Sequence, residues 1–180
     1  MAVWLQIIGK RKFESLAKER EKISNIIHKT KLDLDFLFQS KYNPENWLVK
    51  KTDGMEYFEY KLYGNSKSVM NSIRIIFNNP EFIEFSGPFE FFSNWFLLGD
   101  RYPIEILEGW KKILCEISKN YGITELFYFS EWFFATELIH SNENGENANE
   151  LFEMFENYNY NQKKSLKNMK NNEYYKEILT

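Results

Sequence analysis

The chain has 180 residues, of which 43% are hydrophobic and 18% aromatic, and its formal net charge is −3. This composition excludes wholesale disorder, and the length favours one domain with a substantial buried core. The one cysteine, Cys115, cannot form an internal disulfide, and no apolar run approaches the ~20 residues that cross a bilayer. At the N-terminus the cations follow a short apolar run, which is not the order of a secretory signal. We therefore expect a cytoplasmic protein that does not act at a membrane.

The apolar pattern predicts a strand, a helix and a second strand at the start of the chain. Ala2–Ile8 is rich in β-prone apolar residues and is expected to be a strand. Residues 11–29 place apolar side chains at helical spacing and leave a cationic outer face. Lys31–Phe38 alternates acidic and hydrophobic residues, which predicts a half-buried strand.

The clearest local signal is a β-hairpin. Trp47–Thr52 and Met55–Tyr63 are β-prone segments, and they flank the dipeptide Asp53-Gly54. Two residues of this kind favour the type I′ turn that joins antiparallel strands.

A helix is expected after the hairpin. Ser66 can cap it, and its apolar side chains fall at helical spacing: Val69, Met70, Ile73, Ile76 and Phe77. Pro80 ends the pattern, and Glu81–Phe85 is expected to be a strand. The order strand, helix, strand over residues 55–85 predicts a parallel crossover.

The second half of the chain begins with an aromatic segment. Pro88–Leu98 fits either a short helix or an irregular piece of core. Pro103 is expected in the first turn of a helix that runs to Tyr121 and ends at Gly122. Ile123–Phe129 is expected to be a buried strand.

The C-terminal third is expected to end in a loosely held tail. Glu131–His140 is predicted to be helical, and Glu150–Tyr158 is a short amphipathic piece. Residues 159–180 are predicted to be a polar tail with a weak helix at 173–179. Strands interleaved with helices predict a single α+β (or mixed α/β) domain over residues 1–158, with a mixed β-sheet packed by helices.

Negative charge is concentrated in one part of the chain. Between Pro80 and Glu156 there are fifteen carboxylates and four cations. The same stretch contains Trp95, Trp110 and Trp132. An acidic surface beside large aromatic side chains suits a cationic protein partner, because its field steers the encounter and the aromatics can anchor the complex.

The scarce reactive residues do not form a pattern that predicts catalysis, a metal or another cofactor. His28 lies near the end of the basic first helix, where a cation favours the helix dipole. Glu137 and His140 have a Glu-x-x-His spacing, but a di-iron bundle needs two such motifs and further glutamates. Cys115 lies in the apolar middle of the 103–121 helix, which is typical of a small core residue and not of a reactive thiol.

Nucleic acid is not the expected partner. The helix at 11–29 is basic, but Glu14, Glu19 and Glu21 dilute its charge. The pI of about 5.6 also differs from that of a dedicated nucleic-acid binder, which carries a concentrated basic face. A solvated helix face explains these cations better.

The candidate partner-binding residues are chosen by charge and by aromatic crowding. Trp132, Phe133 and Phe134 are consecutive, so they cannot all face one buried stripe of a helix. At least one of them is expected to be exposed or to cover a groove. The predicted contact residues are Asp100, Glu105, Glu108, Glu125, Glu131, Trp132, Phe133 and Glu137.

In the segment ITELFYFSEWFFATELIH, an expected strand is followed by Ser130, Glu131 and Trp132. In this segment, and in its size, acidity, lack of a catalytic motif and lack of an export signal, the chain resembles the small immunity proteins of bacterial contact-dependent inhibition and polymorphic toxin systems. The resemblance implies an α+β fold and a co-encoded toxin as partner, often a nuclease, whose active site or a remote surface is covered. A nuclease site receives phosphates and is cationic, so a carboxylate array can substitute for the substrate there.

Two other functions remain open. The chain could be an enzyme or small-ligand-binding protein with an aromatic-lined pocket and converging carboxylates. It could also be a subunit of a homo-oligomer, such as a homodimer, that buries exposed aromatic side chains against a second copy.

Overall fold

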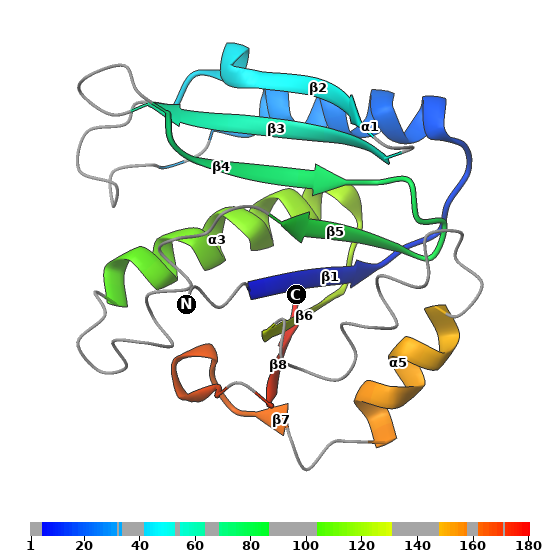
Figure 1. Ribbon diagram of the computed structural model, residues 1–180, viewed down its shortest axis with the longest axis vertical. Coiled ribbons are helices and arrows are strands. Elements are labelled where there is room, and N and C mark those ends of the chain that lie inside the picture. The colour runs from blue at the N-terminus through cyan, green and yellow to red at the C-terminus, as the bar shows by residue number, and fades with distance from the viewer. Residues whose placement is uncertain are drawn as a thin grey trace.

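The computed structural model describes residues 5–31, 33, 42–52, 55–63, 69–86, 104–130, 148–157, 162–170 and 172–180. These residues form an α+β fold, which confirms the predicted fold class (Figure 1). In chain order the elements are β1 (Leu5–Lys10), α1 (Leu16–Lys29), η2 (Pro44–Asn46), β2 (Trp47–Thr52), β3 (Met55–Tyr63), β4 (Val69–Ile76), β5 (Phe82–Ser86), α3 (Ile104–Tyr121), β6 (Glu125–Ser130), α5 (Ala148–Asn157), β7 (Gln162–Lys163), η5 (Leu166–Asn168) and β8 (Tyr174–Ile178).

The strands form one eight-stranded sheet with the order β2-β3-β4-β5-β1-β6-β8-β7. Neighbouring strands are antiparallel, except that β7 and β8 are parallel. The N-terminal strand β1 lies between β5 and β6 and so joins the two halves of the sheet. The predicted mixed sheet is therefore present.

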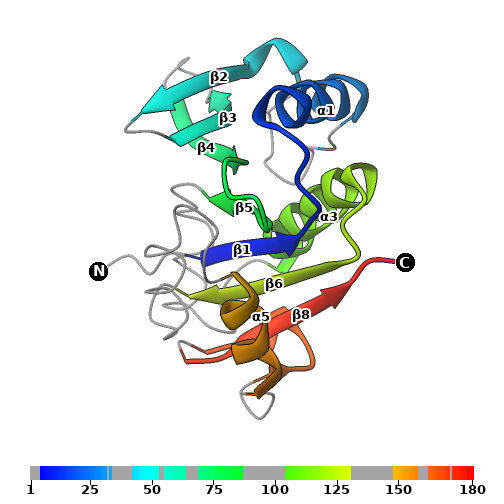
Figure 2. The same cartoon turned by 90° about the vertical axis from the view of Figure 1, so that its right-hand side faces the viewer.

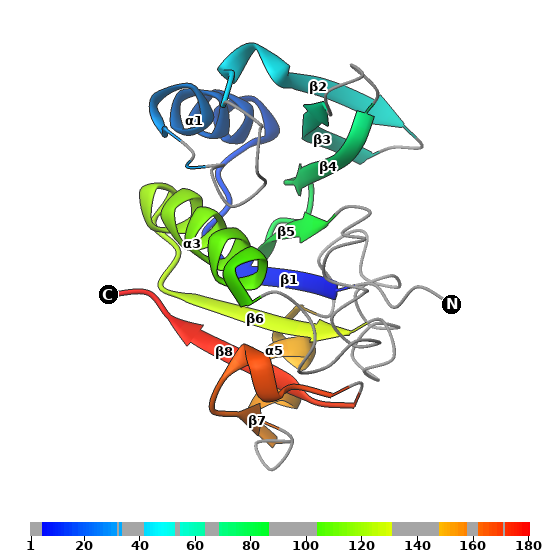
Figure 3. The same cartoon turned by 90° about the vertical axis from the view of Figure 1, so that its left-hand side faces the viewer.

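Helices cover both faces of this sheet (Figures 2 and 3). Helices α1 and α3 lie on one face, and α5 lies on the other. Because successive side chains of a strand point to opposite faces, strand β6 contributes to both layers. Leu126 and Tyr128 pack in the larger core with α1 and α3, whereas Phe127 and Phe129 pack in the smaller core with α5.

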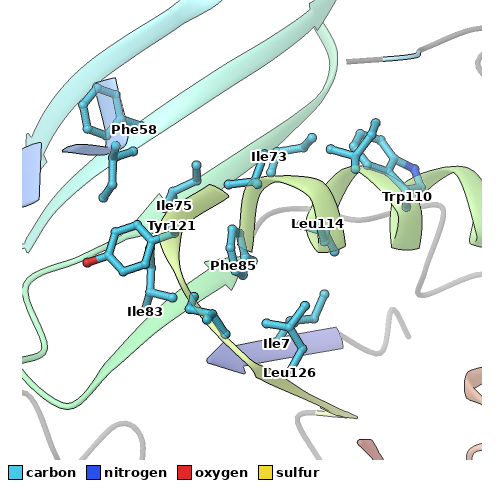
Figure 4. Packing of buried hydrophobic residues seen from close by; sticks show 14 of the residues in the cluster. Ile7, Phe58, Ile73, Ile75, Ile83, Phe85, Trp110, Leu114, Tyr121 and Leu126 are labelled. Carbon is cyan, nitrogen blue, oxygen red and sulfur yellow. The ribbon is translucent and has the colours of Figure 1, made fainter. Parts of the chain in front are cut away.

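The larger core lies between the sheet and helix α3 (Figure 4). Trp110 and Leu114 of α3 are both 0% exposed, and they face strand residues such as Ile7 and Phe85. Trp110 is thus one tryptophan of the acidic stretch that serves the core and cannot anchor a partner.

Local signals define the ends of two helices. Ser15 precedes α1, and its Oγ accepts a hydrogen bond from the backbone N–H of Lys18 at 3.4 Å. Gly122 follows α3 with a φ of 96°, the left-handed conformation that glycine adopts without strain. Its N–H donates to the carbonyl of Ser118 at 3.0 Å, which satisfies one of the last carbonyls of the helix.

The predicted helix after Ser66 is wrong where the structure describes it, because Val69–Ile76 is strand β4. Ile73, Ile75 and Phe77 are buried and alternate with half-buried Arg74 and Ile76, a period of two. Strand β4 pairs antiparallel with β3 on one side and β5 on the other. The predicted parallel crossover over residues 55–85 is therefore also wrong, and this part of the chain is an antiparallel meander.

The prediction for the C-terminal segment is also wrong. The predicted weak helix at 173–179 is strand β8, which pairs antiparallel with β6 from Tyr174 opposite Phe129 to Ile178 opposite Glu125. Tyr174 and Tyr175 are 2% and 9% exposed, so this end of the chain is built into both cores and is not a loosely held tail.

One further prediction is confirmed, and three others are not tested by the described residues. The hairpin strands Trp47–Thr52 and Met55–Tyr63 are confirmed, with Thr52 opposite Met55. The predicted strand Lys31–Phe38 lies almost entirely outside the described residues, and so do the aromatic segment Pro88–Leu98 and the predicted helix Glu131–His140.

Candidate functional site

Helix α3 places two of the predicted contact residues in solvent. Glu105 and Glu108 are exposed and lie three residues apart in the first half of the helix, while Trp110 and Leu114 face the core. Neither carboxylate has an ion-pair partner among the described residues. The lysines that follow in the same helix are occupied, since Lys111 pairs with Glu177 at 2.9 Å and Lys112 pairs with Asp33 at 3.6 Å.

Glu125 does not belong to this group. It begins strand β6 and pairs with Lys176 of β8 at 2.7 Å between Oε1 and Nζ. By strand alternation it shares the face of Phe127 and Phe129, which is the face that α5 covers. The other predicted contact residues lie outside the described residues, and they stay predictions: Asp100, Glu131, Trp132, Phe133 and Glu137.

Helix α5 carries an acidic surface that the sequence-based selection of residues missed. Glu150, Glu153 and Glu156 are exposed, and the helix contains no cation. Its opposite side packs on the sheet through Leu151 and Phe155, both 0% exposed. The signal was present in the sequence, because acidic residues recur every third position between apolar ones in Glu150–Tyr158.

Ion pairing separates these exposed glutamates from most other acidic residues of the described chain. Outside the acidic stretch, seven described acidic residues form ion pairs: Glu14, Glu19, Asp33, Glu56, Glu59, Glu173 and Glu177. Within the described part of the stretch, Glu125 alone does so. The uncompensated negative charge therefore comes largely from α3 and α5. These helices lie on opposite faces of the sheet, so the described carboxylates form two acidic surfaces and not the one patch that we expected.

The buried charges in the first part of the chain have a structural role. The guanidinium of Arg11, whose side chain is 1% exposed, donates to Glu19 Oε2 at 2.8 Å and to the hydroxyl of Tyr121 at 2.9 Å. It also donates to the carbonyl oxygens of Phe77 and Asn79. Burial lowers the pKa of Arg11 to about 10, although the carboxylate of Glu19 partly opposes this effect. Arg11 thus ties α1, α3 and the chain after β4 together.

A second polar cluster lies between α3 and strands β6 and β8. Burial by itself would lower the pKa of Lys111, but the carboxylate of Glu177 raises it above its ordinary value. The hydroxyl of Tyr175 donates to Glu177, and the ammonium of Lys111 lies 5.3 Å from the centre of the Tyr175 ring. Each charge in this cluster is compensated by a neighbour, which is typical of a structural ion pair.

The described cysteine and the described histidine, Cys115 and His28, both have surroundings that fit a structural role. Burial raises the pKa of Cys115, whose Sγ lies 3.9 Å from the hydroxyl of Tyr128, so the thiol is not activated as a nucleophile. His28 is exposed near the end of α1, and its Nδ1 lies 2.7 Å from the carbonyl oxygen of Ser24. His140 and its neighbour Glu137 lie outside the described residues.

One carboxyl group is perturbed without a compensating charge. Glu84 of β5 is half-buried and lies directly opposite Ile76 of β4 and Ile8 of β1. Burial raises the pKa of Glu84 from 4.5 to about 7. The folded state therefore binds this proton more tightly than the unfolded chain does.

This shift predicts a pH-dependent stability. The free energy of unfolding should fall as the pH rises from about 4.5 to about 7, because over this range the unfolded state loses its Glu84 proton while the folded state still holds it. At about 1.4 kcal/mol per pKa unit, the decline is at most about 3.5 kcal/mol. Urea unfolding at a series of pH values should show this decline in the wild type and a smaller one in Glu84→Gln. Parallel profiles for the two proteins would contradict the assignment.

The described residues do not gather three potential metal ligands of the His, Cys, Asp and Glu type at one place. Among the helices that the structure describes, none combines the length and hydropathy needed to span a membrane. Comparison of the chain with protein-family models, with curated proteins and with solved structures gives no match.

Proposed function

We propose that this chain is a non-catalytic binding protein of the immunity-protein kind, which acts in the cytoplasm by neutralising a cationic toxin domain, such as a nuclease. One observation carries the proposal. The exposed carboxylates of α3 and α5 have no ion-pair partners among the described residues, whereas most described acidic residues elsewhere are paired. Uncompensated surface charge contributes nothing to folding, and it attracts a partner of opposite sign.

The acidic surface of α5, formed by Glu150, Glu153 and Glu156, is the stronger of the two candidates for the contact. Glu156 lies in the last turn, where the negative end of the helix dipole adds to the charge of the carboxylates. The positive end of the dipole offsets the charge of a first-turn carboxylate on both helices, Glu150 on α5 and Glu105 on α3, but the last turn of α3 carries a cation, Lys119. The underside of α5 is fixed to the sheet by Phe155, so the three carboxylates are held at defined positions.

The test begins by capturing the partner from the native host at low ionic strength and expressing the captured protein in a heterologous bacterium. We expect the captured protein to be basic, to arrest growth when expressed alone, and to be tolerated when this chain is co-expressed. An acidic or harmless captured protein would overturn the proposal.

Charge variants then locate the contact. With the purified partner at low salt, Glu150→Gln/Glu153→Gln/Glu156→Gln should slow association about tenfold, because electrostatic steering accelerates encounter by one to three orders of magnitude. Glu105→Gln/Glu108→Gln is the matched control and should slow association less. The difference between the two variants should disappear at high salt, where surface charges are screened. Association that does not respond to salt or to either variant would contradict the electrostatic contact.

A further inference from the structure

We propose that Glu84 and Gln6 form a binding site for an alkylammonium or guanidinium group, and that a lysine or arginine side chain of the cationic partner occupies it. The choice of occupant rests on the proposed function, whereas the site itself does not. Gln6 is 8% exposed, and its Oε1 is buried without a hydrogen-bond partner. No hydrogen bond or ion pair reaches Glu84 from any described residue. Buried acceptors without a donor are rare in folded proteins, so this pair calls for a donor from outside the chain.

The two side chains lie on the same face of neighbouring strands. Ile8 of β1 lies directly opposite Glu84 of β5, and Gln6 precedes Ile8 by two residues (Figure 1). Because side chains two positions apart point to the same face, Gln6 is a diagonal neighbour of Glu84. Diagonal neighbours are about 7–8 Å apart, a distance that long side chains bridge. A donor group with two N–H bonds can therefore contact the Glu84 carboxylate and the Gln6 amide oxygen together.

Solvent reaches this part of the sheet from the side of β4. Three residues around Glu84 share its face and are half-buried, as Glu84 itself is: Arg74, Ile76 and Ser86. The residues of β4 and β5 that point to the opposite face are each 0% exposed: Ile73, Ile75, Ile83 and Phe85. Toward α5, Ile8 and Phe82 pack in the smaller core. The site is thus a partly open border beside α5, where Ile8 and Ile76 flank Glu84 and suit an alkyl chain.

The nearest cations in the register are engaged elsewhere. Arg74 is a diagonal neighbour of Glu84, but its Nε lies 3.3 Å from Glu59 Oε1. Lys10 is the diagonal neighbour on β1, and its Nζ lies 5.2 Å from the centre of the Phe152 ring. Since burial raises the pKa of Glu84 to about 7, a proton compensates this carboxyl in the free protein. A bound cation takes the place of the proton, which is released to the solvent.

The position of the site beside α5 relates it to the proposed partner contact. The surface carboxylates of α5 attract a cationic protein from a distance and affect mainly the association rate. A cationic side chain in contact with Glu84 is instead taken out of water, and the loss of one member of such a pair affects mainly the dissociation rate. Variants at the two places are therefore expected to differ in their kinetics.

Titration with n-butylammonium, which carries the terminal group of a lysine side chain, tests the site without the partner. At about pH 8 and constant ionic strength, we expect saturable shifts of the Gln6 side-chain amide and of the Glu84 backbone amide in heteronuclear NMR spectra. Glu84→Gln should weaken binding at least about tenfold, because a neutral side chain cannot compensate the cation. Gln6→Met, which removes the acceptor and keeps the length of the side chain, should also weaken it. Glu21→Gln is the matched control, since it removes an exposed carboxylate from α1 on the opposite face and should leave binding unchanged.

The pH dependence separates this binding from a pair that holds a proton only. The affinity for n-butylammonium should rise about tenfold between about pH 6 and about pH 8, because the cation competes with the proton of Glu84. Gln6 signals that move with pH but not with n-butylammonium would overturn the proposal. Shifts of equal size in the wild type and Glu84→Gln would do so as well.

Kinetics with the captured partner test the occupant. Glu84→Gln should speed dissociation at least about tenfold and leave association almost unchanged, the reverse of the effect expected for the α5 variant. Unchanged dissociation of a basic and toxic partner would overturn the assignment of its side chain to this site and leave the proposed function intact. Capture of an acidic or harmless protein would instead contradict the proposed function, and the n-butylammonium titration would still decide the site.

Discussion

Replacing Glu19 by alanine is expected to lower the free energy of unfolding by about 3–5 kcal/mol, the cost of leaving a buried charge without its partner. Glu19 Oε2 lies 2.8 Å from Arg11 Nη1, and the two side chains are 3% and 1% exposed. The remaining partners of the guanidinium are neutral: the hydroxyl of Tyr121 and the carbonyl oxygens of Phe77 and Asn79. They can accept hydrogen bonds but cannot neutralise its charge.

The same chain region supplies a matched control. Glu14 lies 2.5 Å from Lys18, but both side chains are about two-thirds exposed, at 65% and 67%. Glu14→Ala should therefore leave the stability almost unchanged, since water screens the pair. Urea unfolding followed by tryptophan fluorescence at neutral pH measures both variants. A Glu19→Ala protein that is as stable as Glu14→Ala would contradict the structural role of the buried pair.

The second large effect is expected at Phe155, which holds the acidic helix α5 on the sheet. Its ring is 0% exposed and lies 4.7 Å from the ring of Phe127 and 4.9 Å from that of Tyr174, measured between centroids. The Tyr174 hydroxyl also donates to the carbonyl oxygen of Phe155 at 2.5 Å. Phe155→Ala removes the ring and leaves a cavity, so we expect a loss of about 3–5 kcal/mol.

Truncation of the neighbouring residue Met154 is a control, because it shows how much stability any shortened side chain on α5 costs. Met154 is half-buried at the border of the smaller core, so Met154→Ala should cost clearly less than Phe155→Ala. Thermal unfolding and amide hydrogen exchange of α5 measure the two variants. If Phe155→Ala leaves both the stability and the exchange protection of α5 unchanged, then α5 is not anchored by this cluster.

The elements that were predicted correctly have signals contained within their own segments. The hairpin follows from two β-prone segments around Asp53-Gly54, and both strands have the predicted bounds. Helix α3 follows from a broad apolar stripe that ends at Gly122, whose φ of 96° suits a glycine. Such signals act over a few residues, so they can be read without knowing what lies beside them.

Strands β4 and β8 were missed because their local patterns are ambiguous or weak. In β4, the spacing of Val69, Ile73 and Ile76 also fits the apolar stripe of a helix. Pairing with β3 and β5 decides that the segment is a strand. Strand β8 lies in a polar segment, and its formation depends on Tyr174 and Tyr175 packing against residues of β6 more than forty positions earlier.

The candidate site also depends partly on the local sequence and partly on tertiary packing. The sequence by itself determined how many acidic residues there are and that most of their excess lies between Pro80 and Glu156. Tertiary structure alone decided which of them remain without a cation, because ion pairs such as Arg20 with Glu56 join residues that are far apart in the chain. It also decided that the described carboxylates lie on two faces, since α3 and α5 pack on opposite sides of the sheet. A charge count adds along the chain, whereas an electrostatic surface depends on distances in space.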